Sequence, residues 1–427
     1  MALIDLGEVP EQAETPVRKR PVPYRAVLGA VSLVLVALPA GAAHHPPPRP
    51  PAIIPARLGD TTYLDGDRLF LVGSGAQETG PQETVQNRVV SSYRLPEARL
   101  TGRTTIAVAG AVTGVTQVGD VIVVGYQFDA DGSQGVVAQT AGASSALWRR
   151  TARLVATSPA DGIALLADAT GELAVDLRTG ALRWQVPNSA DGVLTEAGSQ
   201  AGSYPRWLML ITDSGQLRTW DAHTGRPIAS VVVPAVAGRA TGLIWPIGDL
   251  ILVDVGAGYD AYRLPGLDRL WHTAADLSQS WMEIDCGPVI CTFQQQQGMT
   301  ALDPATGAEV WRSDRWAYAE PYGPYLLSGA GAEDPSLFVI DPATGRALGN
   351  FGDWQGLGPA GDGLLYGKTD EHGTYRIYYG LLDPATRRID YLGRADRVSG
   401  DCASTGETAP VLVCRLIDAS YAVWPLR

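Results

Sequence analysis

A ten-residue motif that recurs along the chain constrains its fold more than any other feature. Residues 302–311 read LDPATGAEVW: a short apolar run ends at Asp303, the turn holds Thr306 and Gly307, and Trp311 stands four residues past the glycine. Asp and Thr side chains can hydrogen-bond the backbone of the turn that follows, and glycine adopts a positive φ without the cost that a Cβ brings. The motif therefore predicts a strand, a tight turn and a returning strand anchored by Trp311.

The same spacing recurs elsewhere in the chain. VDLRTGALRW is a second complete copy, and other copies keep the Asp and Thr but replace the glycine or the tryptophan. Degenerate copies end in Trp148 and Trp271. Because the acidic residue recurs once per unit, we interpret it as structural and not catalytic. The repeat positions are Asp176, Thr179, Gly180 and Trp184; Asp221, Thr224, Gly225 and Ala229; Asp303, Thr306, Gly307 and Trp311; Asp341, Thr344, Gly345 and Gly349; and Asp383, Thr386, Arg387 and Tyr391.

A second element, an apolar run that follows a turn, precedes each copy. Examples are GDVIVV from Gly119, GDLILV from Gly248 and GPVICTF from Gly287. Together the two elements recur every 40 to 45 residues, roughly, with about four short strands per unit, which is the pattern of β-propeller blades. Sandwiches also contain such hairpins, but they have no reason to repeat one frame at one period. We predict an all-β propeller in which each Trp-type anchor packs on the neighbouring blade.

The complete copies, Asp176–Trp184 and Asp303–Trp311, resemble the repeat of pyrroloquinoline-quinone-like (PQQ-like) propellers. Quinoprotein alcohol dehydrogenases carry that repeat, and so do BamB-like scaffolds of the outer-membrane assembly machinery. The resemblance covers residues 59–427 and implies a propeller that usually has eight blades. It identifies the fold far better than the activity.

The number of blades can also be counted from the apolar runs. They give nine candidate starts, and the last one, in PVLVCRLIDASYAVWPLR, leaves room for two strands and no returning outer strand. We expect a strand near residues 53–63 to complete the last blade, because closure removes an exposed sheet edge. Eight blades are predicted, with seven and nine as alternatives. The starts lie near Leu69, Val121, Ile163, Leu208, Ile251, Val289, Tyr325, Leu364 and Val411.

The N-terminal part of the chain differs in composition from the rest. Residues 1–25 are polar and end in a basic cluster, whereas residues 26–43 carry no charge and are just long enough to cross a bilayer. The positive-inside rule places the basic side in the cytoplasm and the propeller outside. We expect an uncleaved transmembrane helix, although a small-residue pattern at its end also fits a cleaved signal peptide. A Pro-rich linker at 44–58 then leads to the propeller at 59–427.

The chain has four cysteines, and all of them lie in the predicted propeller, as expected of an exported domain. Four cysteines allow three pairings. Cys286 and Cys291, like Cys402 and Cys414, lie around the start of an apolar run. We therefore predict two local disulfides, Cys286–Cys291 and Cys402–Cys414. No metal site is predicted, because Cys-x2-Cys spacing and nearby His ligands are missing.

Charge and motifs restrict the function classes. The net charge of −12 argues against nucleic acid, whose binding requires clustered Lys and Arg. Nucleophile-elbow, zinc-helix and phosphate-loop motifs are missing from the sequence. We interpret His223, His272 and His372 as solvated residues in or near turns. No catalytic, cofactor-binding or metal-binding residue is predicted, and no cofactor.

Three functions follow from these observations. The first is a non-enzymatic, single-pass membrane protein whose extracytoplasmic propeller offers its rims to a protein or cell-envelope partner; it would be secreted if the apolar segment is cleaved. The second is a PQQ-dependent quinoprotein dehydrogenase, but the resemblance implies a disulfide of adjacent cysteines in those enzymes, and no two cysteines adjoin here. The third is an envelope sensor that signals inward through a partner.

Overall fold

The structure is a computed structural model, and it places residues 50–426 apart from short gaps. The predicted cytoplasmic segment, the predicted transmembrane helix and residues 44–49 of the predicted linker lie outside the described residues. Within the described residues, no helix has the length and apolar character needed to cross a membrane. Contacts divide the chain into two compact units, Met1–Pro48 and Arg49–Arg427, and only the second is described. Its gaps are at 80–83, 129–131, 199–202, 235–243, 257, 276, 278–279, 295–297, 330–335, 372 and 406–409.

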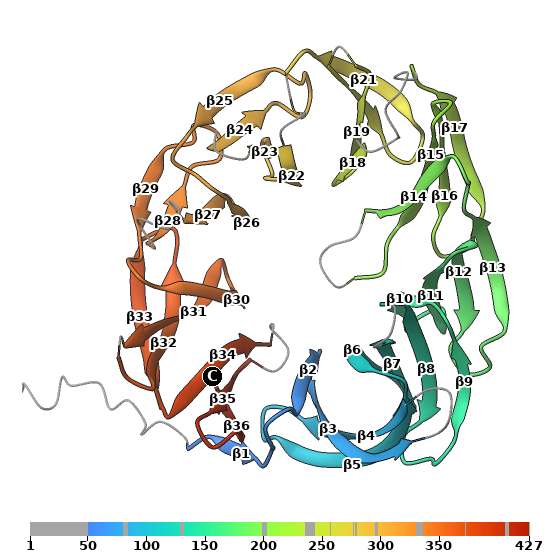
Figure 1. Ribbon diagram of the computed structural model, residues 1–427. Coiled ribbons are helices and arrows are strands. Elements are labelled where there is room, and N and C mark those ends of the chain that lie inside the picture. The colour runs from blue at the N-terminus through green and yellow to red at the C-terminus, as the bar shows by residue number, and fades with distance from the viewer. Residues whose placement is uncertain are drawn as a thin grey trace, which may run out of the picture. The chain divides into compact units, whose positions relative to one another are not determined.

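The described part of the second unit consists of 36 strands in nine four-stranded antiparallel sheets, which are the blades of a propeller (Figure 1). In blades 1 to 8 the strands pair in chain order, and the first strand of each blade lies nearest the centre of the ring. We number the blades from the one that begins with β2.

The strand bounds are given blade by blade. Blades 1 to 3 contain β2 (Thr61–Asp65), β3 (Arg68–Thr79), β4 (Thr84–Arg94) and β5 (Arg99–Val108); β6 (Ala111–Val118), β7 (Val121–Gln127), β8 (Gln134–Thr140) and β9 (Ala146–Arg150); and β10 (Arg153–Ser158), β11 (Ile163–Asp168), β12 (Gly171–Asp176) and β13 (Leu182–Pro187). Blades 4 to 6 contain β14 (Gly192–Ala197), β15 (Trp207–Thr212), β16 (Gln216–Asp221) and β17 (Pro227–Val232); β18 (Ile244–Ile247), β19 (Leu250–Asp254), β20 (Tyr259–Arg263) and β21 (Asp268–Thr273); and β22 (Ser280–Asp285), β23 (Ile290–Gln294), β24 (Gly298–Leu302) and β25 (Glu309–Ser313). Blades 7 to 9 contain β26 (Glu320–Tyr322), β27 (Tyr325–Gly329), β28 (Leu337–Ile340) and β29 (Ala347–Asn350); β30 (Gln355–Gly361), β31 (Leu364–Glu371), β32 (Arg376–Asp383) and β33 (Arg388–Asp396); and β34 (Val398–Ser404), β35 (Val411–Leu416) and β36 (Tyr421–Pro425) with β1 (Ala52–Ile54).

The core of the propeller lies between neighbouring blades. The second strand of a blade is packed on both faces, so β15 is a continuous apolar run and is buried throughout. The fourth strand lies at the outer edge, and in β25 exposed and half-buried residues alternate. The buried apolar residues accordingly form clusters that join one blade to the next, such as the cluster that contains Phe293 of blade 6 and Phe338 of blade 7.

The ring closes through the N-terminal strand, as the sequence predicted. β1 is the outer strand of blade 9 and pairs antiparallel with β36, with Ala52 opposite Val423 and Ile54 opposite Tyr421. The guanidinium of Arg415 also donates to the backbone carbonyl oxygens of Arg57 (2.8 Å) and Asp60 (3.0 Å). The propeller therefore begins at residue 52, within the segment that we had assigned to the Pro-rich linker, because an apolar Ala-Ile-Ile stretch completes the last sheet.

The prediction of eight blades is wrong, and the alternative of nine is confirmed. Each of the nine apolar runs lies at the second strand of a blade, from β3 to β35. Eight was the number that the resemblance implied. The last run is a full blade because its inner strand, β34, precedes it and its outer strand comes from the N-terminus.

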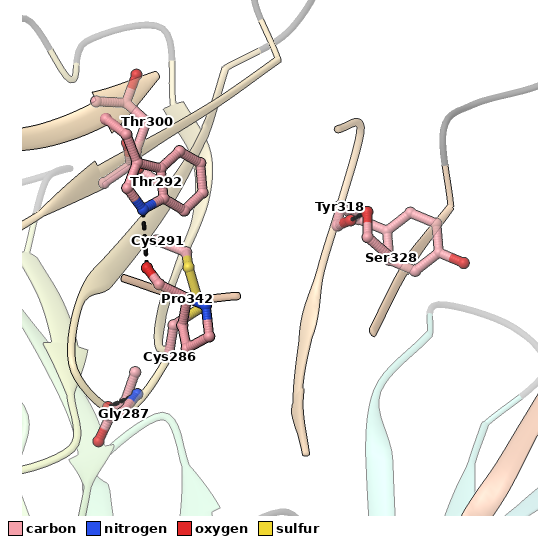
Figure 2. Close-up of a disulfide and its surroundings, with 10 residues drawn as sticks. Cys286, Gly287, Cys291, Thr292, Thr300, Tyr318, Ser328 and Pro342 are labelled. Atoms are coloured by element: carbon pink, nitrogen blue, oxygen red, sulfur yellow. Dashed lines mark hydrogen bonds between the residues drawn. A yellow bond between two sulfur atoms is a disulfide. The ribbon is translucent and has the colours of Figure 1, made fainter. Parts of the chain in front are cut away.

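Both predicted disulfides are confirmed. Cys286–Cys291 and Cys402–Cys414 have S–S distances of 2.07 and 2.11 Å. Figure 2 shows the first of them, which closes the turn between β22 and β23. In the second, the two cysteines are direct cross-strand partners in β34 and β35. Each bond thus ties the inner strand of a blade to the strand behind it.

Candidate binding site

The repeated carboxylates are used inside their own turns. Asp303 accepts hydrogen bonds from the backbone N–H of Ala305 (2.8 Å) and the hydroxyl of Thr306 (2.9 Å). These donors stabilise the ionised form and lower the pKa of Asp303. The pKa of Asp176 is lowered to about 2, chiefly by the guanidinium of Arg183. Because the turns hold these carboxylates, we assign them a structural role.

The repeated tryptophans clamp one blade to the next. The indole N–H of Trp311 donates to the carbonyl oxygen of Pro342 (2.8 Å), in the turn between β28 and β29. The ring lies so close to Gly345 that a Cβ there would be 2.6 Å from it. Trp311 is half-buried, and its contact with the next blade, which the sequence predicted, includes this hydrogen bond. The same arrangement of tryptophan and next-blade glycine holds for Trp148 and Gly180, Trp184 and Gly225, and Trp271 and Gly307.

The interface between blades 7 and 8 inverts this arrangement. Gly349 occupies the tryptophan position of blade 7, and Arg387 occupies the glycine position of the turn in blade 8 with a φ of 57°. A Cβ on Gly349 would lie 2.5 Å from the Cδ of Arg387. The large side chain therefore comes from the turn, and the space for it comes from the strand.

A cavity of about 670 Å³ lies at this same interface, along the inner strands β26 and β30. That volume is within the range of roughly 300–1,000 Å³ that is typical of ligand pockets. Aromatic rings of Tyr318, Tyr322 and Trp354 line the cavity together with Pro321 and Pro359. Tyr318 and Trp354 belong to the loops that lead from an outer strand to the next inner strand, so the cavity reaches that end of the propeller.

The polar groups of the cavity are few. The Tyr322 hydroxyl donates to the carbonyl oxygen of Leu364, so it is already used. Trp354 is only 5% exposed and packs edge-to-face on Tyr391, with ring centroids 5.5 Å apart. Its indole N–H has no hydrogen-bond acceptor among the residues that the structure places. Glu320 carries the one charge among the described lining residues. The cavity thus offers aromatic walls, the carboxylate of Glu320, and the side-chain polar groups of Tyr318, Gln355 and Trp354, which have no hydrogen-bond partner among the described residues.

A second group of ionisable side chains lies between blades 3 and 4. Glu172 is 4% exposed, and burial, followed by the charge of Glu196, raises its pKa to about 8. Arg153 approaches Glu172 to 3.9 Å but makes its closer contact, 2.7 Å, with Glu196. One oxygen of Glu172, Oε2, has no hydrogen-bond partner in the described part of the chain.

The histidines that the structure places are paired. His223 Nδ1 lies 2.6 Å from Asp161 of blade 3, and His272 Nδ1 lies 2.9 Å from the buried Asp260. The pKa of Asp161 is lowered by hydrogen bonds from Ser158 and then from His223. His372 lies outside the described residues.

By the resemblance, a PQQ enzyme would carry a calcium site and a disulfide of adjacent cysteines. That cofactor would need calcium held by carboxylate and amide oxygens. The described residues contain no group of three His, Cys, Asp or Glu side chains that could hold a metal ion. The four cysteines form two disulfides between non-adjacent residues. We therefore derive no reaction step through this cofactor.

The chain is thus a nine-bladed propeller with an aromatic cavity at one interface. No model of a known protein family matches its sequence, and a search of curated proteins found no relative. Its fold is similar to that of BamB from Moraxella catarrhalis, with 14% identity, a TM-score of 0.42, and coverage of 87% of this chain and 95% of BamB. The computationally designed Ika8 protein (15%, 0.44) and Saccharomyces cerevisiae Sqt1 (11%, 0.42) are also similar, each over 74% of this chain and 96% of its own.

Sequence reasoning found the clamps and missed the cavity. Neither Tyr318 nor Trp354 belongs to the repeated motif. The signal that pointed to this interface was the joint loss of the tryptophan at Gly349 and of the glycine at Arg387.

Proposed function

We propose that this protein is an exported, non-enzymatic propeller that binds a protein of the cell envelope in the cavity between blades 7 and 8. The cavity carries the proposal: its lining is mainly apolar and aromatic and holds few polar groups, as is typical of binding sites. The two disulfides support export, because such bonds persist in oxidising compartments. In this proposal the apolar segment 26–43 anchors the protein in the membrane.

Site-specific photo-crosslinking tests the binding proposal. A photoreactive residue would replace Tyr318, which is 43% exposed in the cavity, in the full-length protein in its own membrane. The control position is Val232, a 73% exposed residue on the outer strand of blade 4. We expect a discrete light-dependent protein adduct from position 318 and none from position 232. The same adducts from both positions, or none from either, would count against the cavity as the binding site.

A reporter fusion tests the topology. A reporter enzyme that works only outside the cytoplasm would be fused after Arg427 of the full chain. The basic cluster before residues 26–43 predicts activity of this fusion. Activity of a cytoplasmic reporter alone at the same position would overturn the proposed localisation.

A further inference from the structure

The strands at the cavity are poor templates for an added β-strand. β26 has three residues, and Pro321, which lacks an N–H group, is the middle one. β30 contains Pro359 and two bulges, between Gly356 and Gly358 and between Pro359 and Gly361. Proline and bulges at an edge block pairing with another strand. A ligand of this cavity must therefore be recognised through side chains and not through a β-ladder.

One of the hydrogen-bonding groups of the cavity, the indole N–H of Trp354, is a donor only, whereas Tyr318, Glu320 and Gln355 also offer acceptor oxygens. Indole N–H can donate but cannot accept. Trp316, in the equivalent loop of the preceding interface, donates to the carbonyl oxygen of Gly345 (2.9 Å), whereas Trp354 has no acceptor within the described residues. The ligand that suits Trp354 presents carbonyl oxygens. A proline-rich segment does so, because its backbone is open to solvent and its prolines have no N–H that would need an acceptor.

The walls and the charge of the cavity fit the same ligand. Polyproline II segments dock on aromatic-lined grooves, and they lose little conformational entropy because their shape is already formed. Tyr318, Tyr322 and Trp354 provide such a lining. The carboxylate of Glu320 favours a ligand that carries a basic residue beside its prolines.

From these contacts we propose that the cavity binds a proline-rich segment of a partner protein, in the polyproline II conformation and with one basic residue. This inference rests on the proposed binding function and specifies its ligand. The chain has a segment of this kind, PPPRPP at 46–51. That segment continues into Ala52, which lies at the end of β1 near the turns between third and fourth strands, whereas the cavity reaches the loops at the opposite end. We assign the ligand to a partner protein, and binding between two copies of the chain is an outcome of the test below.

Peptide binding to the full-length protein tests the inference. The probe is a synthetic, fluorescently labelled PPPRPPA peptide, and the controls are PPPEPPA and the flexible GSGRGSA, all titrated by fluorescence anisotropy. We expect saturable binding of PPPRPPA and binding about tenfold weaker, or weaker still, for both controls. Trp354→Phe should weaken binding of PPPRPPA about tenfold, since it removes one hydrogen bond and keeps most of the ring. Glu320→Gln should remove the preference for Arg over Glu, whereas Glu309→Gln, an exposed carboxylate on β25, should change nothing.

Several results would overturn the inference. The inference would fail if GSGRGSA bound as tightly as PPPRPPA. It would also fail if a Trp354→Phe protein with an unchanged melting temperature bound PPPRPPA as tightly as the unchanged protein does. A crosslink at position 318 that persists at saturating PPPRPPA would overturn the proline-rich ligand and leave the binding function standing. If a neutral oligosaccharide displaced PPPRPPA, the ligand would be a carbohydrate and not a proline-rich segment. Self-association that disappears when Pro46, Pro47 and Pro48 are changed to Ser would assign the site to a second copy of the chain.

Discussion

Two neighbouring interfaces of the propeller have equivalent loops, each with a tryptophan, but differ in how closely their side chains pack. Between blades 6 and 7, Trp311 clamps Gly345, and Trp316 is 2% exposed, donates to a carbonyl and packs on Phe338 with ring centroids 5.3 Å apart. Between blades 7 and 8, Gly349 stands in the position of the clamping tryptophan. Trp354, in the loop equivalent to that of Trp316, lines a cavity.

The difference shows that an interface between blades needs a strand residue and a turn residue of complementary size, and not particular residue types. At most clamps a large strand residue meets a small turn residue, and at Gly349 and Arg387 the sizes are exchanged. The blades still close, so the outer strands do not require the tryptophan. The inner strands then have room for a cavity. We propose that this interface trades packing for binding, and the following predictions test that proposal.

Truncation of Trp316 should have the largest effect. Trp316→Ala removes a fully packed ring, so the free energy of unfolding should fall by roughly 3–5 kcal/mol. The comparison between the interfaces uses one substitution at both: Trp316→Phe, which loses the hydrogen bond to Gly345, should cost about 1–3 kcal/mol, and Trp354→Phe less than about 1 kcal/mol, because no hydrogen bond to described residues is lost. Urea unfolding of the full-length protein measures all three variants. Equal losses for the two Phe variants would mean that the two interfaces do not differ as described.

The interface between blades 3 and 4 sharpens the comparison, since it has the clamp and also a buried acid. The pKa of Glu172 is about 8 in the folded protein and 4.5 in the unfolded chain. Between pH 4.5 and about pH 8, Glu172 is protonated in the folded protein and ionised in the unfolded chain. The stabilisation that proton binding gives the folded state is therefore complete below the unfolded pKa and is lost as the pH rises through the folded pKa. From about pH 5 to about pH 9 the unfolding free energy should fall by about 4 kcal/mol more than in Glu172→Gln. Parallel pH profiles would contradict the assignment.

The exchange of sizes between Gly349 and Arg387 can be tested by a double-mutant cycle. Gly349→Trp alone should destabilise by about 1–2 kcal/mol, because the new ring meets the Arg387 side chain. Adding Arg387→Gly should recover most of that loss, since it restores the arrangement of the other clamps. Additive losses in denaturant unfolding would show that the two positions are not coupled.

The sequence predicted the parts of the fold that depend on local patterns. The Asp-Thr-Gly turns, the nine apolar runs and the local disulfides follow from spacing along the chain. The blade number was missed because the eight blades implied by the resemblance were preferred to the nine apolar runs, although the closing strand was expected near residues 53–63 and β1 does pair with β36. The cavity was missed for a different reason, since Trp354 and Trp316 look alike in sequence and differ only in whether the next blade supplies an acceptor.

The most direct test of the account is to fill the cavity. Ala317→Trp places a large ring at an exposed lining position, and Ala343→Trp places the same ring at an exposed turn at the opposite end of the same blade. Each variant would carry the photoreactive residue at position 318, and its adduct and melting temperature would be compared with those of the unfilled protein. We predict that Ala317→Trp abolishes the adduct with an unchanged or raised melting temperature, whereas Ala343→Trp keeps the adduct. An adduct of undiminished yield in a folded Ala317→Trp protein would show that the cavity is a gap in packing and not the binding site.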